Sequence, residues 1–299
     1  MPNLADLFVT AGEVSGTTTS PETLLFVAAR YPCKKSQELE RYFFDCLRLK
    51  NGTYKTTYAH RLDDLNAHVA SYLPSAEPLE VLDVAISSGV STLEWADLLE
   101  TAKVQYHITG IDLSIGGVLV SFGNRLHTVL DHKNRPLLYE IDGRWVSNRP
   151  LQICRHLLQV AFVKFALFLW ARKGAAVQRI LRMPTRSRAV SLVTPKLLSH
   201  PRVTIKEGDI LTESSLQGTF HVIRAANILN RAYFDDDVLA DMMRHFRSHL
   251  IENGIFVICD TDKDINRATV FKLKEDKQFA VLSTMNGGSG LEELILKLR

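Results

Sequence analysis

The spacing of apolar residues along the chain changes at about residue 77. Before this point, apolar side chains recur every three to four positions in the stretches 35–49 and 58–72, which is typical of helices that bury one face. Residues 1–76 are therefore predicted to form an N-terminal helical cap.

After residue 77, short apolar runs alternate with amphipathic stretches. The runs typical of buried strands occupy residues 80–86, 106–112, 203–210, 220–228 and 254–261. The stretches typical of helices occupy residues 91–102, 235–250 and 290–298. Residues 268–285 lack helical spacing and predict an antiparallel hairpin. The order predicts an α/β domain over residues 77–299, with a doubly wound, mostly parallel sheet that ends in this hairpin.

A long insertion, residues 115–200, separates the second predicted strand from the third. Within it, Asp142-Gly143 predicts the turn of a small hairpin. The run from Leu157 to Trp170 is apolar apart from Gln159 and Lys164, which predicts a helix. Its 14 residues are too few to cross a bilayer, which needs ~20. The insertion is thus expected to be partly helical.

Charge is concentrated in this insertion. The whole chain has a net charge of +3, yet residues 143–200 contain 11 basic residues and no acidic one. An apolar helix beside an arginine-rich flank is typical of a helix that lies on an anionic membrane surface, which we expect for residues 151–188. A buried accessory helix beside a solvated basic face is the ordinary alternative. An RNA-binding face is less favoured, because nucleic acid does not require so apolar a helix.

The overall composition, 46% hydrophobic and 23% charged, is typical of a soluble globular protein. The four cysteines form no CxxC pair, and no cluster of histidines has metal-ligand spacing, so no metal site is predicted. The N-terminal residues do not have the pattern of a signal peptide. The expected location is the cytoplasm, with the inner face of the membrane as an option if the insertion binds lipid.

The segment VLDVAISSG, residues 81–89, joins a predicted strand to a predicted helix. A Rossmann-type loop binds a nucleotide in this context, because small residues let the backbone approach the ligand closely. Asp83 and Gly89 keep the expected residue types. Ala85 and Ser87 stand where glycine is usual, and we expect them to fit if their φ angles are negative.

Five motifs in this order resemble those of class I S-adenosylmethionine-dependent methyltransferases, over residues 80 to 285. They are 81-VLDVAISSG-89, 110-GIDLS-114, 207-EGDI-210, 220-FHVIRAANI-228 and 250-LIENGIFVI-258. The resemblance implies S-adenosylmethionine as cofactor, with the loop residues Asp83, Ala85 and Gly89 against it.

The same resemblance assigns roles to residues at three further strand ends. Asp112 would hold the ribose hydroxyls, because a carboxylate offers two acceptor oxygens in one plane. Asp209 and Ile210 would line the adenine. Asn227 would lie near the methyl group.

A second, narrower resemblance lies upstream of the first strand. The segment 57-TYAHR-61 is similar to the Thr-x-Phe-Phe-Arg region of chemotaxis-receptor glutamate methyltransferases, as 227-NILNRAYF-234 is to their Asn-x-x-x-Tyr-Phe segment. This implies that Arg61 pairs with the cofactor carboxylate. Tyr58 and His60 lie in the same segment and, with Asn227, are candidates to orient or deprotonate an acceptor. Surface or packing roles are the ordinary alternative for each.

The predicted function is transfer of a methyl group to a small or lipophilic acceptor. Methyl transfer is an in-line substitution in which positioning supplies most of the catalysis, so a clear base is not required. The alternatives are an RNA or protein methyltransferase that binds through the basic insertion, and a non-catalytic binding module with a degenerate loop. The sequence specifies neither the acceptor atom nor the oligomeric state.

Overall fold

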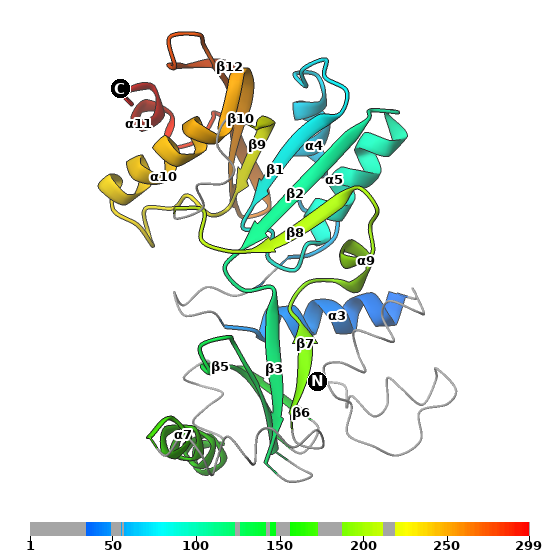
Figure 1. Ribbon diagram of the computed structural model, residues 1–299, viewed down its shortest axis with the longest axis vertical. Helices are drawn as coiled ribbons and strands as arrows, with labels where there is room; N and C mark the ends of the chain where they lie inside the picture. The colour runs from blue at the N-terminus through cyan, green and yellow to red at the C-terminus, as the bar shows by residue number, and fades with distance from the viewer. Residues whose placement is uncertain are drawn as a thin grey trace. The chain divides into compact units, whose positions relative to one another are not determined.

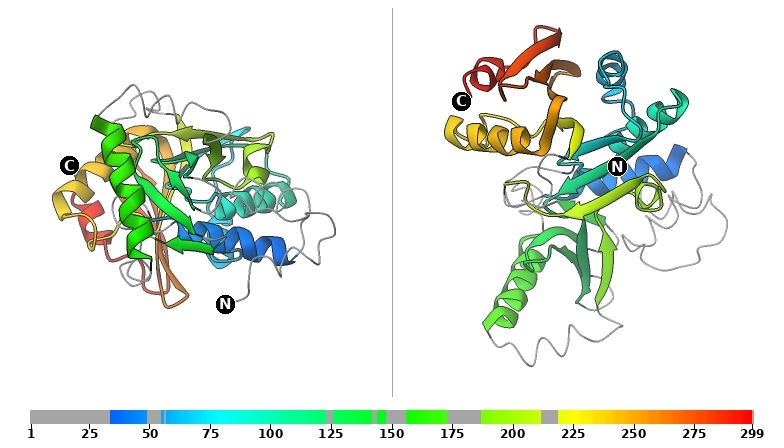
Figure 2. Two further views of the ribbon diagram at one scale, coloured as in Figure 1. Left: turned by 90° about the horizontal axis from the view of Figure 1, so that it is seen from below. Right: turned by 45° about the horizontal axis from the view of Figure 1, so that its top comes forward.

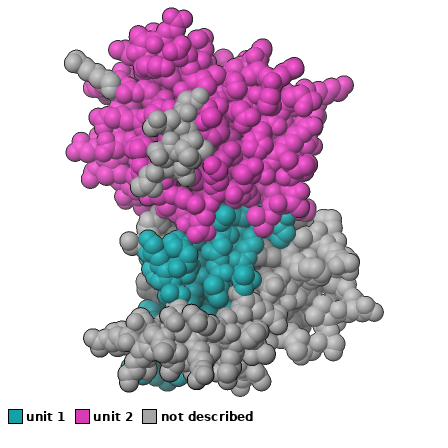
Figure 3. Space-filling view, viewed as in Figure 1, with its two compact units in different colours: residues 1–57, 114–195 teal, residues 58–113, 196–299 magenta. Residues whose placement is uncertain are grey.

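The computed structural model describes residues 34–48, 55, 57–122, 126–141, 144–147, 156–172, 187–211 and 219–298. The chain divides into two compact units, shown in different colours in Figure 3. Unit 1 comprises residues 1–57 and 114–195, and unit 2 comprises residues 58–113 and 196–299. Each unit has a sheet of its own.

Unit 2 is built on a seven-stranded sheet in the order β12-β11-β10-β9-β1-β2-β8 (Figure 1). Its strands are β1 (Leu79–Val84), β2 (Tyr106–Asp112), β8 (Val203–Glu207), β9 (Phe220–Ala226), β10 (Leu250–Asp262), β11 (Ile265–Leu273) and β12 (Phe279–Met285). Neighbouring strands in the run β8-β2-β1-β9-β10 pair in parallel. The strands β11 and β12 are antiparallel additions at the β10 edge. The predicted fold class, a mostly parallel sheet ending in an antiparallel hairpin, is confirmed.

Helices cover both faces of this sheet because successive strand residues point to opposite sides. They are α4 (Asp63–Ala70), α5 (Val90–Thr101), α10 (Asp236–His249) and α11 (Glu292–Leu296), with the short α9 (Pro195–Leu198) between β7 and β8. Val81 packs with α4 and α5 through Leu65 and Trp95. Its neighbour Leu82 belongs to the cluster on the other face, which includes Phe246 of α10.

The strand order reverses direction at β1. This strand pairs with β2 on one side, whereas β9, which comes later in the chain, lies on its other side. Open α/β sheets bind ligands outside the carboxyl ends of the strands at such a point. The segments after Val84, Asp112 and Ala226 therefore mark the edge at which a site is expected.

Unit 1 contains a five-stranded antiparallel sheet in the order β6-β5-β4-β3-β7. Its strands are β3 (Gly116–Ser121), β4 (Leu126–Leu130), β5 (Pro136–Ile141), β6 (Arg144–Ser147) and β7 (Ser187–Ser191). The helix α3 (Lys34–Cys46) covers one face and α7 (Leu157–Arg172) covers the other (Figure 2). Leu119 packs with α3, and the next residue, Val120, packs with α7.

Two predictions for the insertion are confirmed. The helix α7 lies where the apolar run predicted one, and β5 and β6 form the small hairpin, with Asp142 and Gly143 themselves outside the described residues. The strands β3, β4 and β7 were not predicted. Among the helices of the described part, none is both long and apolar enough to cross a membrane.

The division into units differs from the predicted cap, residues 1–76. The helix α3 belongs to unit 1, because Phe43 and Phe44 are fully buried in a cluster with Leu119 and Val129 of the insertion. The helix α4 belongs to unit 2, where Leu65 packs against the larger sheet. The first part of the predicted cap, residues 1–33, lies outside the described residues.

Candidate functional site

The loop between β1 and α5 turns through three left-handed residues. Ala85 and Ser87 have φ angles of 58° and Gly89 has a φ of 81°. The condition under which Ala85 and Ser87 were expected to fit, negative φ angles, is therefore not met. An L-residue loses roughly 1–2 kcal/mol in this region of φ, which glycine avoids. The loop keeps a backbone course that suits glycine at all three positions, although only Gly89 remains.

Asp112, at the end of β2, lies directly against this loop. Its Oδ2 accepts a hydrogen bond from the backbone N–H of Ser87 at 2.8 Å, and the residue is 6% exposed. The N–H of Ala85 donates to the carbonyl of Ile111, at 2.8 Å. The adjacent Ser88 hydroxyl is buried and has no partner in the part of the chain that the structure describes. Asp112 and the loop thus form one polar cluster at the carboxyl ends of β1 and β2.

Asp83 lies below the loop in a buried ion pair with Arg224 of β9. Nε and Nη2 of Arg224 donate to Oδ1 and Oδ2 of Asp83 at 2.9 and 2.6 Å. The Thr92 hydroxyl donates to Oδ2 at 2.7 Å. Asp83 therefore supports the loop from inside the sheet, and its role as a direct cofactor ligand stays a prediction.

Arg224 is only 2% exposed, and four hydrogen bonds engage its guanidinium. Besides Asp83, its guanidinium donates to the amide oxygen of Asn66 at 2.7 Å and to the carbonyl of Ser91 at 3.2 Å. Its Cζ lies 4.2 Å from the centre of the Trp95 ring. The sequence analysis missed this residue. The available signal was a single arginine inside the apolar strand run 220–228, in register with Asp83 of the neighbouring strand.

Asn227 follows β9 with a φ of 59° and uses its side-chain amide to hold β10. Oδ1 accepts from the N–H of Thr261 at 2.7 Å, and Nδ2 donates to the Thr261 hydroxyl at 3.0 Å. Thr261 donates in turn to Asn266, whose amide donates to the carbonyl of Arg61 at 2.8 Å and to Asp64 at 2.6 Å. These bonds connect the end of β9 to the segment before α4. The predicted catalytic role of Asn227 is untested.

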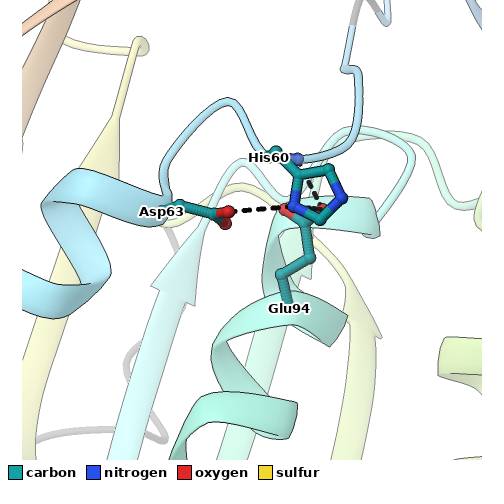
Figure 4. Close-up of side chains that lie close together, drawn as sticks. All are labelled: His60, Asp63 and Glu94. Carbon is teal, nitrogen blue, oxygen red and sulfur yellow. Dashed lines mark hydrogen bonds and ion pairs between the residues drawn. The ribbon is translucent and has the colours of Figure 1, made fainter.

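The segment 58–62 is anchored to α5 through His60 (Figure 4). The His60 N–H donates to Oε1 of Glu94 at 2.6 Å, and its Nδ1 lies 2.9 Å from Oδ2 of Asp63. The hydrogen bond to Asp63 raises the pKa of the exposed His60 ring. Burial raises the pKa of Glu94, because desolvation penalises its charged form. The imidazole is thus exposed and able to exchange a proton.

Tyr58 and Arg61 flank His60. The Tyr58 hydroxyl donates to Asp264 at 2.7 Å, and Cζ of Arg61 lies 5.9 Å from the centre of the Tyr58 ring. The Arg61 backbone is fixed by Asn266, as described above. The pairing of Arg61 with a cofactor carboxylate remains a prediction.

Asp209 and Ile210 lie just after β8, next to β2. The N–H of Gly208 donates to the Asp112 carbonyl at 3.0 Å. Asp209 therefore directly follows the residue that contacts the backbone of Asp112. Asp209 is exposed and accepts from the N–H of Leu211 at 3.0 Å. Ile210 is buried in the core cluster that contains Val84. All the predicted site residues lie in unit 2, and Asp83, Ala85, Gly89 and Asp112 meet at a single loop.

Within the described residues, two groups place histidine and carboxylate atoms close enough to hold a metal ion. They are His60, Asp63 and Glu94, and Asp97, Glu100 and His200. Hydrogen bonds that involve His60 account for the arrangement of the first group.

The residues at this edge fit a ligand that carries a ribose. A carboxylate at the end of the second strand is the acceptor that two vicinal hydroxyls require, and Asp112 has this position. The tight loop lets the backbone approach a ligand closely. The Ser88 hydroxyl, which has no partner among the described residues, provides a polar group beside Asp112. The departure is Asp83, whose carboxylate is engaged by Arg224.

No family model matches the sequence, and no curated protein matches it. Solved structures with similar folds include the CMeT domain of the citrinin polyketide synthase, at 14% identity and a TM-score of 0.35. That similarity covers 78% of this chain and 41% of the other, so the chain spans less than half of its length.

Two further similar structures are NodS and SpnF. NodS is an N-methyltransferase from Bradyrhizobium japonicum WM9 in complex with S-adenosyl-L-homocysteine, at 14% identity and a TM-score of 0.32, covering 75% of this chain and 71% of its own. SpnF is a [4+2]-cyclase, at 13% identity and a TM-score of 0.33. The similarity covers 83% of this chain and 62% of SpnF.

Proposed function

We propose that this chain is an S-adenosylmethionine-dependent methyltransferase that acts on a small or lipophilic acceptor. The observation that carries the proposal is the contact of Asp112 with the loop 85–89, at the point where the strand order reverses. Two non-glycine residues keep left-handed φ angles in this loop. Such strain persists where the surroundings enforce it, and it is concentrated at functional sites.

The chain's own residues would bind and orient the cofactor. Asp112 is assigned to the ribose hydroxyls, and Asp209 with Ile210 to the adenine. Arg61, fixed at its carbonyl by Asn266, is assigned to the cofactor carboxylate, because a guanidinium binds a carboxylate through two parallel hydrogen bonds. When bound, S-adenosylmethionine supplies an activated methyl group.

The acceptor would be oriented by the segment that contains Tyr58 and His60. The exposed His60 ring can accept a proton from an acceptor, while Asp63 stabilises the charged imidazolium. Asn227 is assigned a positioning role, because both ends of its amide hold Thr261.

A non-catalytic binding module is the second candidate. The observation that favours it is the ion pair of Asp83 with Arg224, which commits the first acidic residue of the loop motif to the interior. Such a module would bind the nucleoside without methyl transfer.

A labelling experiment distinguishes these functions. The full chain is incubated with methyl-labelled S-adenosylmethionine and a cell extract that is afterwards separated into lipid, small-molecule, RNA and protein fractions. The proposal predicts label in the lipid or small-molecule fraction, and its loss in Asp112→Ala. The matched control is Asp97→Ala, an exposed carboxylate on α5, which should label as the wild type does. Label in RNA or protein, or in no fraction, would contradict the proposal.

A further inference from the structure

The helix α7 of unit 1 is apolar on the side that faces away from its own sheet. Val160 and Val163 are buried in a cluster with Tyr139 and Ile141 of β5. In contrast, Leu157, Leu158, Phe162 and Phe165 are 60%, 83%, 55% and 60% exposed. The sequence alternative of a fully buried accessory helix therefore does not hold for these four side chains.

Three of these four exposed residues form one stripe along the helix. Leu158, Phe162 and Phe165 follow the spacing i, i+4, i+7, which places them on a common face. Val160 and Val163 lie on the opposite face, against the sheet. A helix that covers a sheet in water normally carries charged or polar residues on its outer face. Gln159 and Lys164, between the two faces, are the polar residues among positions 157–165.

An exposed apolar stripe of this kind marks an interaction surface, because soluble proteins rarely leave large apolar patches in water. The helix has 16 residues and is therefore ~24 Å long, shorter than the ~30 Å of a bilayer core. The helix is therefore too short to cross a bilayer and can contact a partner only along its side. A short helix with an exposed apolar side can lie in the plane of a membrane surface.

The charge of the surrounding sequence selects the kind of surface. Residues 143–200 contain 11 basic residues and no acidic one. Lys164 is exposed on α7 itself. The 14 residues that follow the helix in sequence, 173–186, contribute four of these positive charges, at Lys173, Arg179, Arg182 and Arg186. Basic residues beside an apolar face are attracted to anionic lipid head groups, each by ~1 kcal/mol near the surface.

We propose that the outer face of α7 docks on an anionic membrane surface, with Leu158, Phe162 and Phe165 inserted among the lipid chains. Lys164, which is exposed on the same helix, then meets the head groups. RNA does not fit the apolar stripe, because nucleic acid does not require so apolar a helix. A second copy of this chain is an outcome of the test below. This inference does not rest on the proposed methyl transfer, because α7 and the candidate site belong to different units. If both hold, the acceptor is a lipophilic molecule that the membrane supplies.

Vesicle co-sedimentation of the full chain tests the proposal without any activity measurement. We expect the chain to pellet with vesicles of phosphatidylcholine and phosphatidylserine at about 0.1 M salt, and to pellet much less with phosphatidylcholine alone. Raising the salt to about 1 M should weaken binding without abolishing it, because only the electrostatic part is screened. The double variant Leu158→Ser/Phe165→Ser should lower the vesicle partition coefficient by at least about tenfold.

The matched control removes two exposed apolar side chains from unit 2. Leu198 and Leu296 are 50% and 43% exposed, and Leu198→Ser/Leu296→Ser should bind vesicles as the wild type does. Thermal unfolding followed by circular dichroism shows whether both double variants are folded. Equal pelleting by the two variants, or equal binding to neutral and anionic vesicles, would overturn the proposal. So would dimerisation in analytical ultracentrifugation that Leu158→Ser/Phe165→Ser abolishes, because it would assign the stripe to a second copy.

Discussion

Arg224 carries its positive charge in the middle of the seven-stranded sheet, on the strand next to Asp83. Burying an ion pair costs desolvation energy that its mutual attraction offsets only when the geometry is good and the remaining donors are satisfied. The geometry is good here, since both oxygens of Asp83 accept from the guanidinium. Asn66 and Ser91 accept two further hydrogen bonds, and Trp95 lies under the guanidinium. The pair fixes the start of the loop that carries the candidate site.

Removing one partner of this pair should be severely destabilising. Arg224→Met leaves the Asp83 carboxylate buried and uncompensated, and should lower the free energy of unfolding by about 3–5 kcal/mol in urea denaturation. The same substitution at Arg231, in the exposed pair Arg231–Asp236, should lower the free energy of unfolding far less. The double variant Asp83→Leu/Arg224→Met should lose less than the sum of its single variants. Additive losses would show that the two side chains are not coupled.

The left-handed residues of the loop 85–89 make a second prediction at this scale. Ala85→Gly and Ser87→Gly remove the Cβ that disfavours a φ of 58°, so each should raise the free energy of unfolding by about 0.5–1 kcal/mol. Ala67→Gly is the control, because Ala67 is exposed within α4, where glycine should cost about 1 kcal/mol. Losses at positions 85 and 87 as large as at 67 would mean that the loop conformation is different.

The sequence revealed the residues of this cluster but not their partners. Asp83 and Asp112 were recognisable because the first lies within a predicted strand, the second ends one, and both belong to motifs of a known family. The pairing of Asp83 with Arg224 depends on β9 lying next to β1, although 141 residues separate them in the chain. The positive φ at Ala85 was not predicted either. Residue type favours negative φ there, and the surrounding hydrogen bonds overrule that preference.

At the scale of secondary-structure elements, β5 contains an unusual buried carboxylate. Glu140 is 3% exposed, and its Oε1 has no hydrogen-bond partner among the described residues. Its neighbours across the sheet are His127 of β4 and Trp145 of β6. Burial raises the pKa of Glu140 from 4.5 to about 7. Between these values the folded chain therefore binds more protons than the unfolded chain.

This difference predicts that stability falls as the pH rises. The contribution of Glu140 is fully present below its unfolded pKa of 4.5 and is lost as the pH rises through its folded pKa of about 7. The total loss is about 3 kcal/mol. Glu140→Gln should remove this slope and stabilise the chain at about pH 8, whereas Glu275→Gln, in the exposed turn after β11, should change neither. Urea denaturation at several pH values measures both. An unchanged slope in Glu140→Gln would contradict the assignment.

Element type was more predictable than element partnership. The helices α5 and α10 and the strand β2 lie within one or two residues of their predicted bounds, because each has a long and regular apolar pattern. The strands β3 and β4 were missed because they are short, and β4 is joined to β5 by an irregular turn. One turn is held by Asp131, which accepts from the N–H groups of Lys133 and Arg135 at 2.9 Å.

At the scale of the whole molecule, the chain passes between the two units three times, after residues 57, 113 and 195. Sequence order alone placed α3 in an N-terminal cap, since nothing local shows that Phe43 and Phe44 pack against strands that come more than 70 residues later. Unit 2 holds all of the predicted site residues, and unit 1 holds the exposed face of α7. The two proposed functions, ligand binding and membrane docking, can thus be tested separately by mutation.

The central claim is that unit 2 binds a nucleoside cofactor through Asp112. Its most direct test is calorimetric titration of the purified full chain with S-adenosylhomocysteine, the demethylated product, which avoids any need for an acceptor. We predict binding in the micromolar range, weakened about 10- to 100-fold in Asp112→Ala by loss of a charged hydrogen-bond acceptor, and unchanged in Asp97→Ala. No heat of binding with the wild type, or equal affinity in Asp112→Ala, would contradict the claim.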